Sequence, residues 1–107
     1  MVRWHFLVAI PAALLLTNGI PHFTQSIAGK PFLTPFVGGP PNLDSAVNNI
    51  WWGAGNLIAG GVLLWLIRDG LSNWLLILEL LIIAVAFAAL LALTFSGAIQ
   101  LRRKRRP

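Results

Sequence analysis

The segment at residues 74–98 constrains this chain more than any other feature. It is built largely from Leu, Ile, Ala, Val and Phe, and Glu79 is the only charged residue in it. At ~1.5 Å of rise per residue, a helix of this length crosses the ~30 Å hydrocarbon layer of a bilayer. The sequence therefore predicts an all-α integral membrane protein.

The composition agrees with this class. Hydrophobic residues make up 57% of the chain and charged residues only 10%, whereas roughly 25% of an ordinary soluble domain is charged. A chain of 107 residues has room for one membrane domain, which we assign to residues 1–107. Cysteine is absent, which excludes disulfides, thiolate metal sites and cysteine nucleophiles.

Two further segments qualify as transmembrane helices. Residues 46–67 carry no charge and follow Asp44 and Ser45, which are good helix N-caps. Residues 4–21 are shorter and contain Pro11, a kink that a membrane helix tolerates. We expect three transmembrane helices, and a short connection predicts that the second and third form a tight antiparallel hairpin.

The orientation follows from the basic residues. A cleaved signal peptide is the alternative for the first segment, with small residues at 26–28 as its cleavage site. Cleavage would leave two spans and place the basic tail at 101–107 outside, against the positive-inside rule. Three spans with the N-terminus outside leave Lys30 and the tail in the cytoplasm, and only Arg3 and Arg68 outside. We expect the N-terminus outside and the C-terminus in the cytoplasm, although Arg3 beside the N-terminal amine opposes this orientation.

The tail itself has one expected partner. Five of the eight basic residues lie in residues 101–107, directly after a predicted span. Such clusters contact anionic lipid headgroups. The tail lacks the interleaved aromatic residues of nucleic-acid-binding segments, so we expect lipid headgroups and no nucleic acid as its partner.

Residues 22–45 differ from the spans because they are rich in proline and glycine. Both residues disfavour helix and strand interiors. Phe32 and Phe36 lie between these prolines, and exposed phenylalanine is expected on the bilayer interface or against the helices. A flexible linker would favour serine, glycine and charge instead. We therefore predict an ordered, extended loop.

The second predicted helix carries a stripe of small and polar residues. Asn49, Gly53, Asn56 and Gly60 recur at steps of four, three and four, which places them on one face. Helices in lipid associate through close packing of small residues and through side-chain hydrogen bonds. The stripe is therefore predicted to face another helix, with a ligand site as the alternative.

The third predicted helix has a ridge of small residues at four-residue intervals: Ala84, Ala88, Ala92 and Ser96. This spacing also suits close helix packing. We expect the ridge to contact another helix of this chain or of a partner.

Glu79 is the one carboxylate inside a predicted span. It lies about five residues, or ~8 Å, below the membrane boundary. Intramembrane carboxylates are candidates for function, although a structural hydrogen bond explains this one as well. By depth, we expect His5 or the Trp65 indole to bond it.

A polar cluster is expected at the opposite membrane face. Asn18 and His22 leave the first helix at the level where Asn48, Asn49 and Trp52 begin the second. His5 and His22 should lie at opposite faces, so they cannot share one metal ion. We predict no catalytic, cofactor-binding or metal-ligating residues.

The motifs at residues 18–23 (NGIPHF), 29–32 (GKPF), 34–36 (TPF) and 49–56 (NxxWGxxN) together resemble a family of small, uncharacterised bacterial membrane proteins. The resemblance covers about residues 18–60, and the last helix matches only in being apolar. The resemblance implies a location in the bacterial inner membrane. It does not suggest any particular activity.

Three functions remain open. We favour a non-enzymatic subunit that assembles with itself or with a larger membrane complex through its small-residue helix faces. The first alternative is an oligomeric ion- or proton-coupled transporter or channel subunit that uses Glu79. The second is a membrane enzyme that acts on lipid or quinone through His22, although no nucleophile with its base supports it.

Overall fold

The computed structural model describes residues 3–39 and 42–105 of the chain, with side chains up to residue 98. It contains three α-helices: α1 (Arg3–Ile27), α2 (Ala46–Leu66) and α3 (Trp74–Arg105). Short 3-10 helices, η1 (Pro35–Val37) and η2 (Arg68–Gly70), lie in the two connections. The described residues form no strand, which confirms the all-α class.

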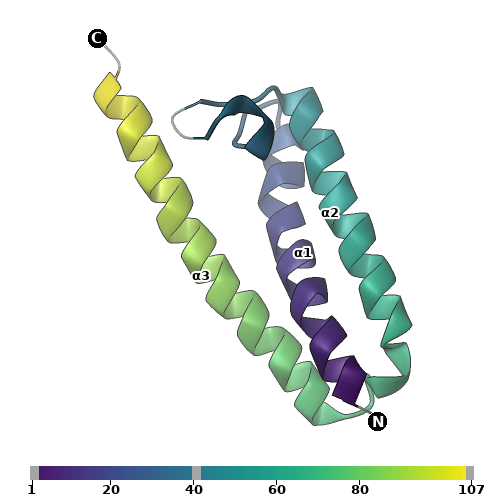
Figure 1. Cartoon of the computed structure of the whole chain (residues 1–107). Helices are drawn as coiled ribbons and strands as arrows, with labels where there is room; N and C mark the ends of the chain where they lie inside the picture. Colours follow the sequence, from purple (N-terminus) through teal and green to yellow (C-terminus); the bar gives the residue numbers. More distant parts are fainter. Residues whose placement is uncertain (1–2, 40–41, 106–107) are drawn as a thin grey trace.

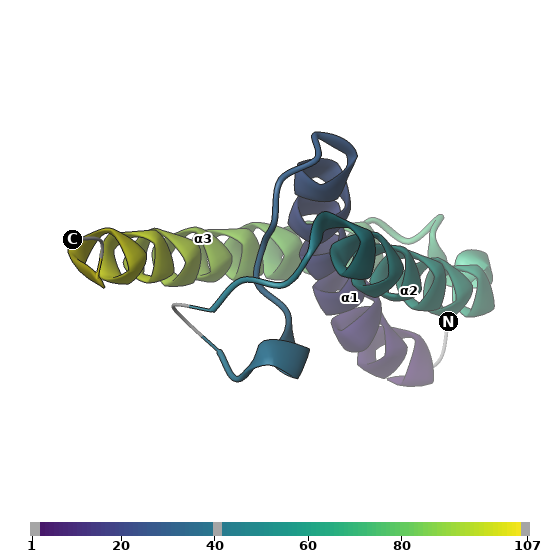
Figure 2. The ribbon, with the colours of Figure 1, turned by 90° about the horizontal axis from the view of Figure 1, so that it is seen from above.

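The three helices form one elongated bundle in which α1 lies between α2 and α3 (Figures 1 and 2). The loop between α1 and α2 covers one end of the bundle, and η2 lies at the other end, beside the N-terminus. The predicted tight hairpin of the second and third helices is therefore wrong. Each of these helices packs against α1 instead.

Helix α1 is longer than predicted, since it continues through Pro21 to Ile27. Side chains bond its last turns: the Thr24 hydroxyl donates to the Ile20 carbonyl, and the Ser26 hydroxyl donates to the His22 carbonyl. The predicted loop therefore begins six residues later than expected.

Glycine ends α1. Gly29 has a φ of 76°, in the left-handed region that favours glycine. Its N–H donates to the Ser26 carbonyl at 2.9 Å, and the Lys30 N–H donates to the Gln25 carbonyl at 3.1 Å. This pair of bonds is the Schellman arrangement, and it satisfies carbonyls that the helix end would otherwise leave unpaired.

Side-chain caps set the starts of the other helices. The Ser45 hydroxyl accepts from the Asn48 N–H at 3.1 Å, so α2 begins where predicted. The Asn73 side chain accepts from the Leu75 N–H at 2.9 Å at the start of α3. Helix α3 continues to Arg105, past the predicted end at residue 98. The basic side chains of the tail lie outside the described residues, so their expected contact with lipid headgroups stays a prediction.

Two helices are long and apolar enough to cross a membrane: Arg3–Ile27 and the part of α3 at Trp74–Ala98. The expected third span, α2, does not meet the same standard of hydropathy. Its asparagines, Asn48, Asn49 and Asn56, account for this because they lower its mean hydropathy. Three spans are therefore not shown by length and hydropathy alone.

Helices α1 and α2 approach closely along the predicted stripe. Asn49, Gly53, Asn56 and Gly60 are the buried residues of α2. A Cβ atom at Gly53 would lie 2.6 Å from the backbone nitrogen of Phe23. The prediction that this stripe faces another helix is confirmed, and that helix is α1.

Helix α3 contacts the rest of the chain at its beginning and again near Phe95. Leu76, Ile67 and Ala9 form a small, fully buried apolar cluster at its beginning. Towards its C-terminal end, α3 diverges from α1 (Figure 1). Within this chain the ridge is not closely packed, since Ala84 is half-buried while Ala88, Ala92 and Ser96 are exposed, and its expected packing stays a prediction.

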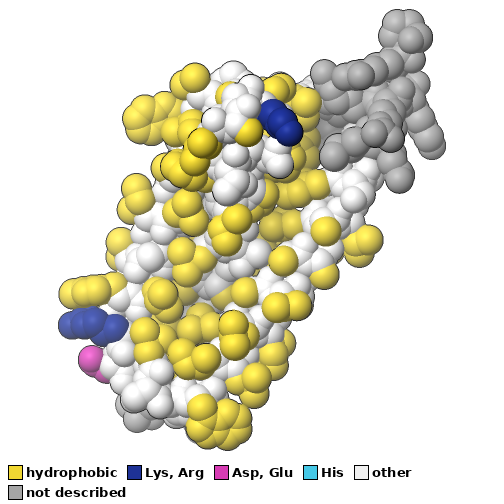
Figure 3. All heavy atoms as spheres, turned by 180° about the vertical axis from the view of Figure 1, so that it is seen from behind, with side chains coloured by type: hydrophobic (Ala, Val, Ile, Leu, Met, Phe, Trp, Pro, Cys, Tyr) yellow, Lys and Arg dark blue, Asp and Glu magenta, His cyan; other side chains and the backbone are white. Residues whose placement is uncertain are grey.

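The surface has the distribution expected in a bilayer. On the face in Figure 3, charged side chains lie near the two ends, and apolar side chains cover the length between them. Exposed tryptophans also lie at both ends, with Trp4, Trp65 and Trp74 at one and Trp51 at the other. Such positions are typical of aromatic residues at membrane interfaces.

Candidate functional site

The polar cluster predicted at the loop end of the bundle is present, and Asn49 is its centre. The Asn49 Oδ1 atom lies 2.9 Å from His22 Nδ1 of α1. The Asn49 Nδ2 atom donates to the Phe32 carbonyl of the loop at 3.0 Å and to the Ser45 carbonyl at 3.1 Å. One fully buried amide thus joins α1, the loop and the start of α2.

These bonds also indicate how His22 bonds. Because the Asn49 Nδ2 atom faces backbone carbonyls, its Oδ1 atom must be the one that faces the imidazole. An amide oxygen only accepts hydrogen bonds, so His22 Nδ1 donates in this contact, and the ring also forms a hydrogen bond with the backbone of Leu33. The histidine therefore acts as a donor that ties α1 to α2.

Aromatic rings enclose the imidazole of His22. Its centroid lies 5.1 Å from that of Phe32, 5.9 Å from that of Phe95 of α3, and 6.3 Å from that of Trp52. Phe32 and Phe95 meet edge to face at 4.7 Å. Phe32 thus packs on the helices, as predicted, whereas Phe36 is 69% exposed and contacts Trp52 by its edge.

Asp44 holds the loop closed, a role that its sequence position as a possible helix cap did not reveal. Its backbone pairs with Phe32 through two hydrogen bonds of 2.8 and 3.1 Å. Its carboxylate accepts from the Thr34 hydroxyl at 2.7 Å and from Asn48 Nδ2 at 2.8 Å. The bond from Thr34, followed by that from Asn48, holds the pKa of Asp44 below its usual value of 3.8. Asp44 thus joins Phe32 and Thr34 of the loop to Asn48 of α2.

A pH dependence follows from this carboxylate. A depressed pKa in the folded state means that ionised Asp44 stabilises the loop at neutral pH, and that this contribution is lost as the pH falls from about 4 through the lowered pKa. We expect amide hydrogen exchange at Phe32 and Asp44, measured in detergent micelles, to accelerate over this range after correction for intrinsic rates. Asp44→Asn should exchange faster at neutral pH and lose the pH dependence; an unchanged acid transition in this variant would contradict the assignment.

A second pair of polar residues lies deeper between α1 and α2. Asn18 Nδ2 donates to Asn56 Oδ1 at 3.2 Å, and Asn56 Nδ2 donates to the Trp52 carbonyl at 2.8 Å. The sequence predicts Asn18 at the level of Asn49, but the structure places its hydrogen bond with Asn56, about two helical turns further along α2. Asn48 also leaves the expected cluster, since its side chain bonds Asp44 on the exposed side of α2.

Glu79 is only partly buried, but its Oε2 atom is enclosed and has no hydrogen-bond partner among the described residues. The expected donors therefore do not reach this oxygen. The ring of His5 is buried and stacks on Trp4 at 4.0 Å. Trp65 is 60% exposed, and the Arg68 guanidinium lies 3.9 Å from its ring centroid.

The described side chains offer no group of three or more His, Asp or Glu residues that could hold a metal ion. His5 and His22 lie 17 positions apart on one helix, or ~25 Å at 1.5 Å per residue. No protein-family model matches the chain, and no curated protein or solved structure is significantly similar to it.

Proposed function

We propose that the chain is a three-span integral membrane protein without enzymatic activity that serves as an assembly or accessory subunit of a membrane complex. The observation that carries this proposal is the state of α3. Between residues 74 and 98 it is apolar apart from Glu79 and a few small hydroxyl residues, yet almost none of it is buried by the rest of the chain. A helix with this surface needs lipid or another helix around it.

The hydrogen bonds of α2 support its place as the third span. The side chains of Asn49 and Asn56 bond to α1, to the loop or to the backbone of α2 itself. The outward side of the helix presents apolar residues such as Ile58 and Val62. Its 21 residues rise by ~31 Å, which matches the hydrocarbon layer.

The polar side chains also support a structural role. His22, Asn49, Asn18 and Asn56 bond to one another or to the backbone across helix contacts. The outward face of α3, which includes Val85, Ala89 and Leu93, remains exposed. We infer that a second copy or a larger partner packs there, in a bacterial inner membrane with the N-terminus outside.

The absence of cysteine makes single-cysteine labelling a direct test of this proposal. Three spans place exposed Ser72 and exposed Ala28 on opposite sides of the membrane. We expect a membrane-impermeant maleimide to label Ser72→Cys in intact cells, and Ala28→Cys only after permeabilisation. Labelling of both on one side would show that α2 does not cross.

Two further single-cysteine variants address assembly. We expect Ala89→Cys, on the outward face of α3, to form crosslinks to a partner or a second copy in native membranes. Ile58→Cys, on the outward face of α2, is the matched control. Equal crosslinking at the two positions, or none at Ala89→Cys, would contradict assembly through α3.

A further inference from the structure

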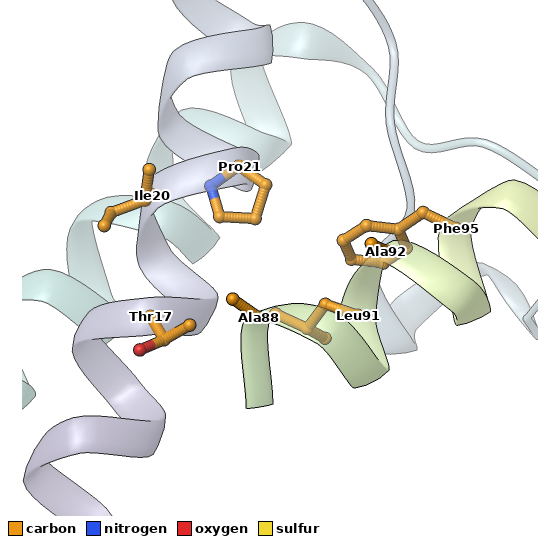
Figure 4. A pocket seen from close by; sticks show the side chains of 7 residues that line it. All are labelled: Thr17, Ile20, Pro21, Ala88, Leu91, Ala92 and Phe95. Carbon is orange, nitrogen blue, oxygen red and sulfur yellow. The ribbon is translucent and has the colours of Figure 1, made fainter. Parts of the chain in front are cut away.

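Two hollows meet where α3 diverges from α1. The first, of about 300 Å³, lies between the two helices (Figure 4) and is lined by Thr17, Ile20, Pro21, Ala88, Leu91, Ala92 and Phe95. The second, of about 230 Å³, lies beneath the loop and is lined by Asn18, His22, Leu33, Thr34, Pro35, Trp52 and Phe95. Phe95 lines both, so the two hollows adjoin.

The two hollows differ in chemistry. Apart from the Thr17 hydroxyl, the side chains of the first are apolar. The second adds the side chains of Asn18, His22 and Thr34. An apolar compartment next to a polar one is the complement of an amphipathic molecule.

The polar hollow offers few free hydrogen-bonding groups. The Nδ1 hydrogen of His22 is committed to Asn49, and its ring also bonds the backbone of Leu33. The Thr34 hydroxyl is committed to Asp44. Asn18 donates one amide hydrogen to Asn56. An amide has a second hydrogen and an acceptor oxygen, so Asn18 can still donate and accept.

Charge narrows the class of ligand further. No lysine or arginine is among the described residues that line either hollow. Among these lining residues, a phosphate or carboxylate head would therefore lose its hydration without gaining a cation. An uncharged head that donates or accepts hydrogen bonds avoids this cost.

We propose that the two hollows form one binding site for a neutral amphiphile of the membrane. Its acyl or isoprenoid chain lies between α1 and α3, and its uncharged head, such as an alcohol or a quinone ring, bonds Asn18. This orientation of the ligand suits a bilayer. Its head would lie at the loop end of the bundle, level with Trp52, and its hydrocarbon chain would extend towards the bilayer centre. Ligand sites typically start at about 300 Å³, so the combined space is adequate.

The part of the site that holds the hydrocarbon chain of the ligand is tested with a long-chain alcohol that carries a diazirine in the middle of its hydrocarbon chain. This probe is added to the protein in lipid nanodiscs. After irradiation, peptide mass spectrometry should find labels concentrated at residues 17–21 and 88–95. Ala92→Leu fills the hollow and should reduce this labelling about tenfold, a loss of ~1.4 kcal/mol. Ala59→Leu adds the same bulk to an exposed position of α2 that lines neither hollow, and it should leave the labelling unchanged. Labels spread evenly around α3, or no effect of Ala92→Leu, would reduce the site to ordinary lipid contact and overturn the proposal.

The part of the site that binds the uncharged head of the ligand needs its own control, because Asn18 also forms a hydrogen bond with Asn56. Asn18→Ala and Asn56→Ala break the same hydrogen bond, but only the first removes a lining side chain. We expect weaker labelling in Asn18→Ala and wild-type labelling in Asn56→Ala. The corresponding fatty acid, ionised at alkaline pH, should compete about tenfold less well than the alcohol. Equal loss in both variants, or equal competition by the acid, would overturn the assignment of a neutral head at Asn18.

Discussion

Gly53→Ala is expected to separate α1 from α2 and to lower the free energy of unfolding by about 3 kcal/mol, at the upper end of overpacking costs. The added Cβ atom would lie 2.6 Å from the backbone nitrogen of Phe23 and 2.9 Å from its Cα atom. Backbone atoms cannot rotate away as a flexible side chain can. The helices must therefore move apart along the stripe, which also strains the bond between His22 and Asn49. Thermal unfolding in detergent, followed by circular dichroism, measures the loss.

Gly55→Ala is the matched control, because it places the same methyl group on the same helix. Nothing lies within 4 Å of a Cβ atom at Gly55. Alanine favours helix over glycine by up to ~1 kcal/mol, so this variant should be as stable as the wild type or more stable. The two substitutions thus have opposite expected signs. A similar loss from both would show that the contact of Gly53 with Phe23 does not limit the packing of α1 against α2.

Asn49→Leu is expected to have the second large effect, a loss of about 3 kcal/mol. Leucine has a similar size, but it leaves the Nδ1 hydrogen of His22 without its partner, and the Phe32 carbonyl keeps only its bond from the Asp44 N–H. Each buried polar group left in this way costs ~1–3 kcal/mol. The loop should detach from α2 before the helices separate, so hydrogen exchange at Phe32 should accelerate more than exchange in the middle of α1.

Asn48→Leu controls for the loss of one asparagine from the same turn. Asn48 is exposed, and its side chain bonds only the Asp44 carboxylate. Its replacement removes one hydrogen bond to an ionised carboxylate and should cost about 1.5 kcal/mol, the lower end for bonds to charged groups. Equal losses from the two variants would argue that Asn49 acts locally and does not join the three segments.

Features that belong to a single helix could be predicted from the sequence. The stripe of Asn49, Gly53, Asn56 and Gly60 is a matter of helical period, and the structure confirms that it is buried. The start of α2 follows from the capping chemistry of Ser45. The polar cluster at the loop end followed from depth alone, because residues at one level of adjacent helices meet.

Features that depend on the choice of neighbour could not be predicted. Nothing in the period of α3 indicates whether its partner is α1 or α2, and the expected hairpin was wrong for this reason. The end of α1 depends on the left-handed conformation of Gly29, eight residues past Pro21, where the sequence predicts the helix to end. Asp44 closes the loop through Thr34, ten residues earlier, a contact that no local pattern records.

The central place of α1 has a consequence for biosynthesis. Domains form from the N-terminus during synthesis, so α1 is made before either of the helices that it contacts. Each later helix then adds to a surface that already exists, and α2 and α3 need not find each other. Insertion of α3 completes a bundle in which the Asn49 connections between α1, the loop and α2 are already made. The order of synthesis and the order of packing are therefore the same, which leaves few ways for this small chain to assemble incorrectly.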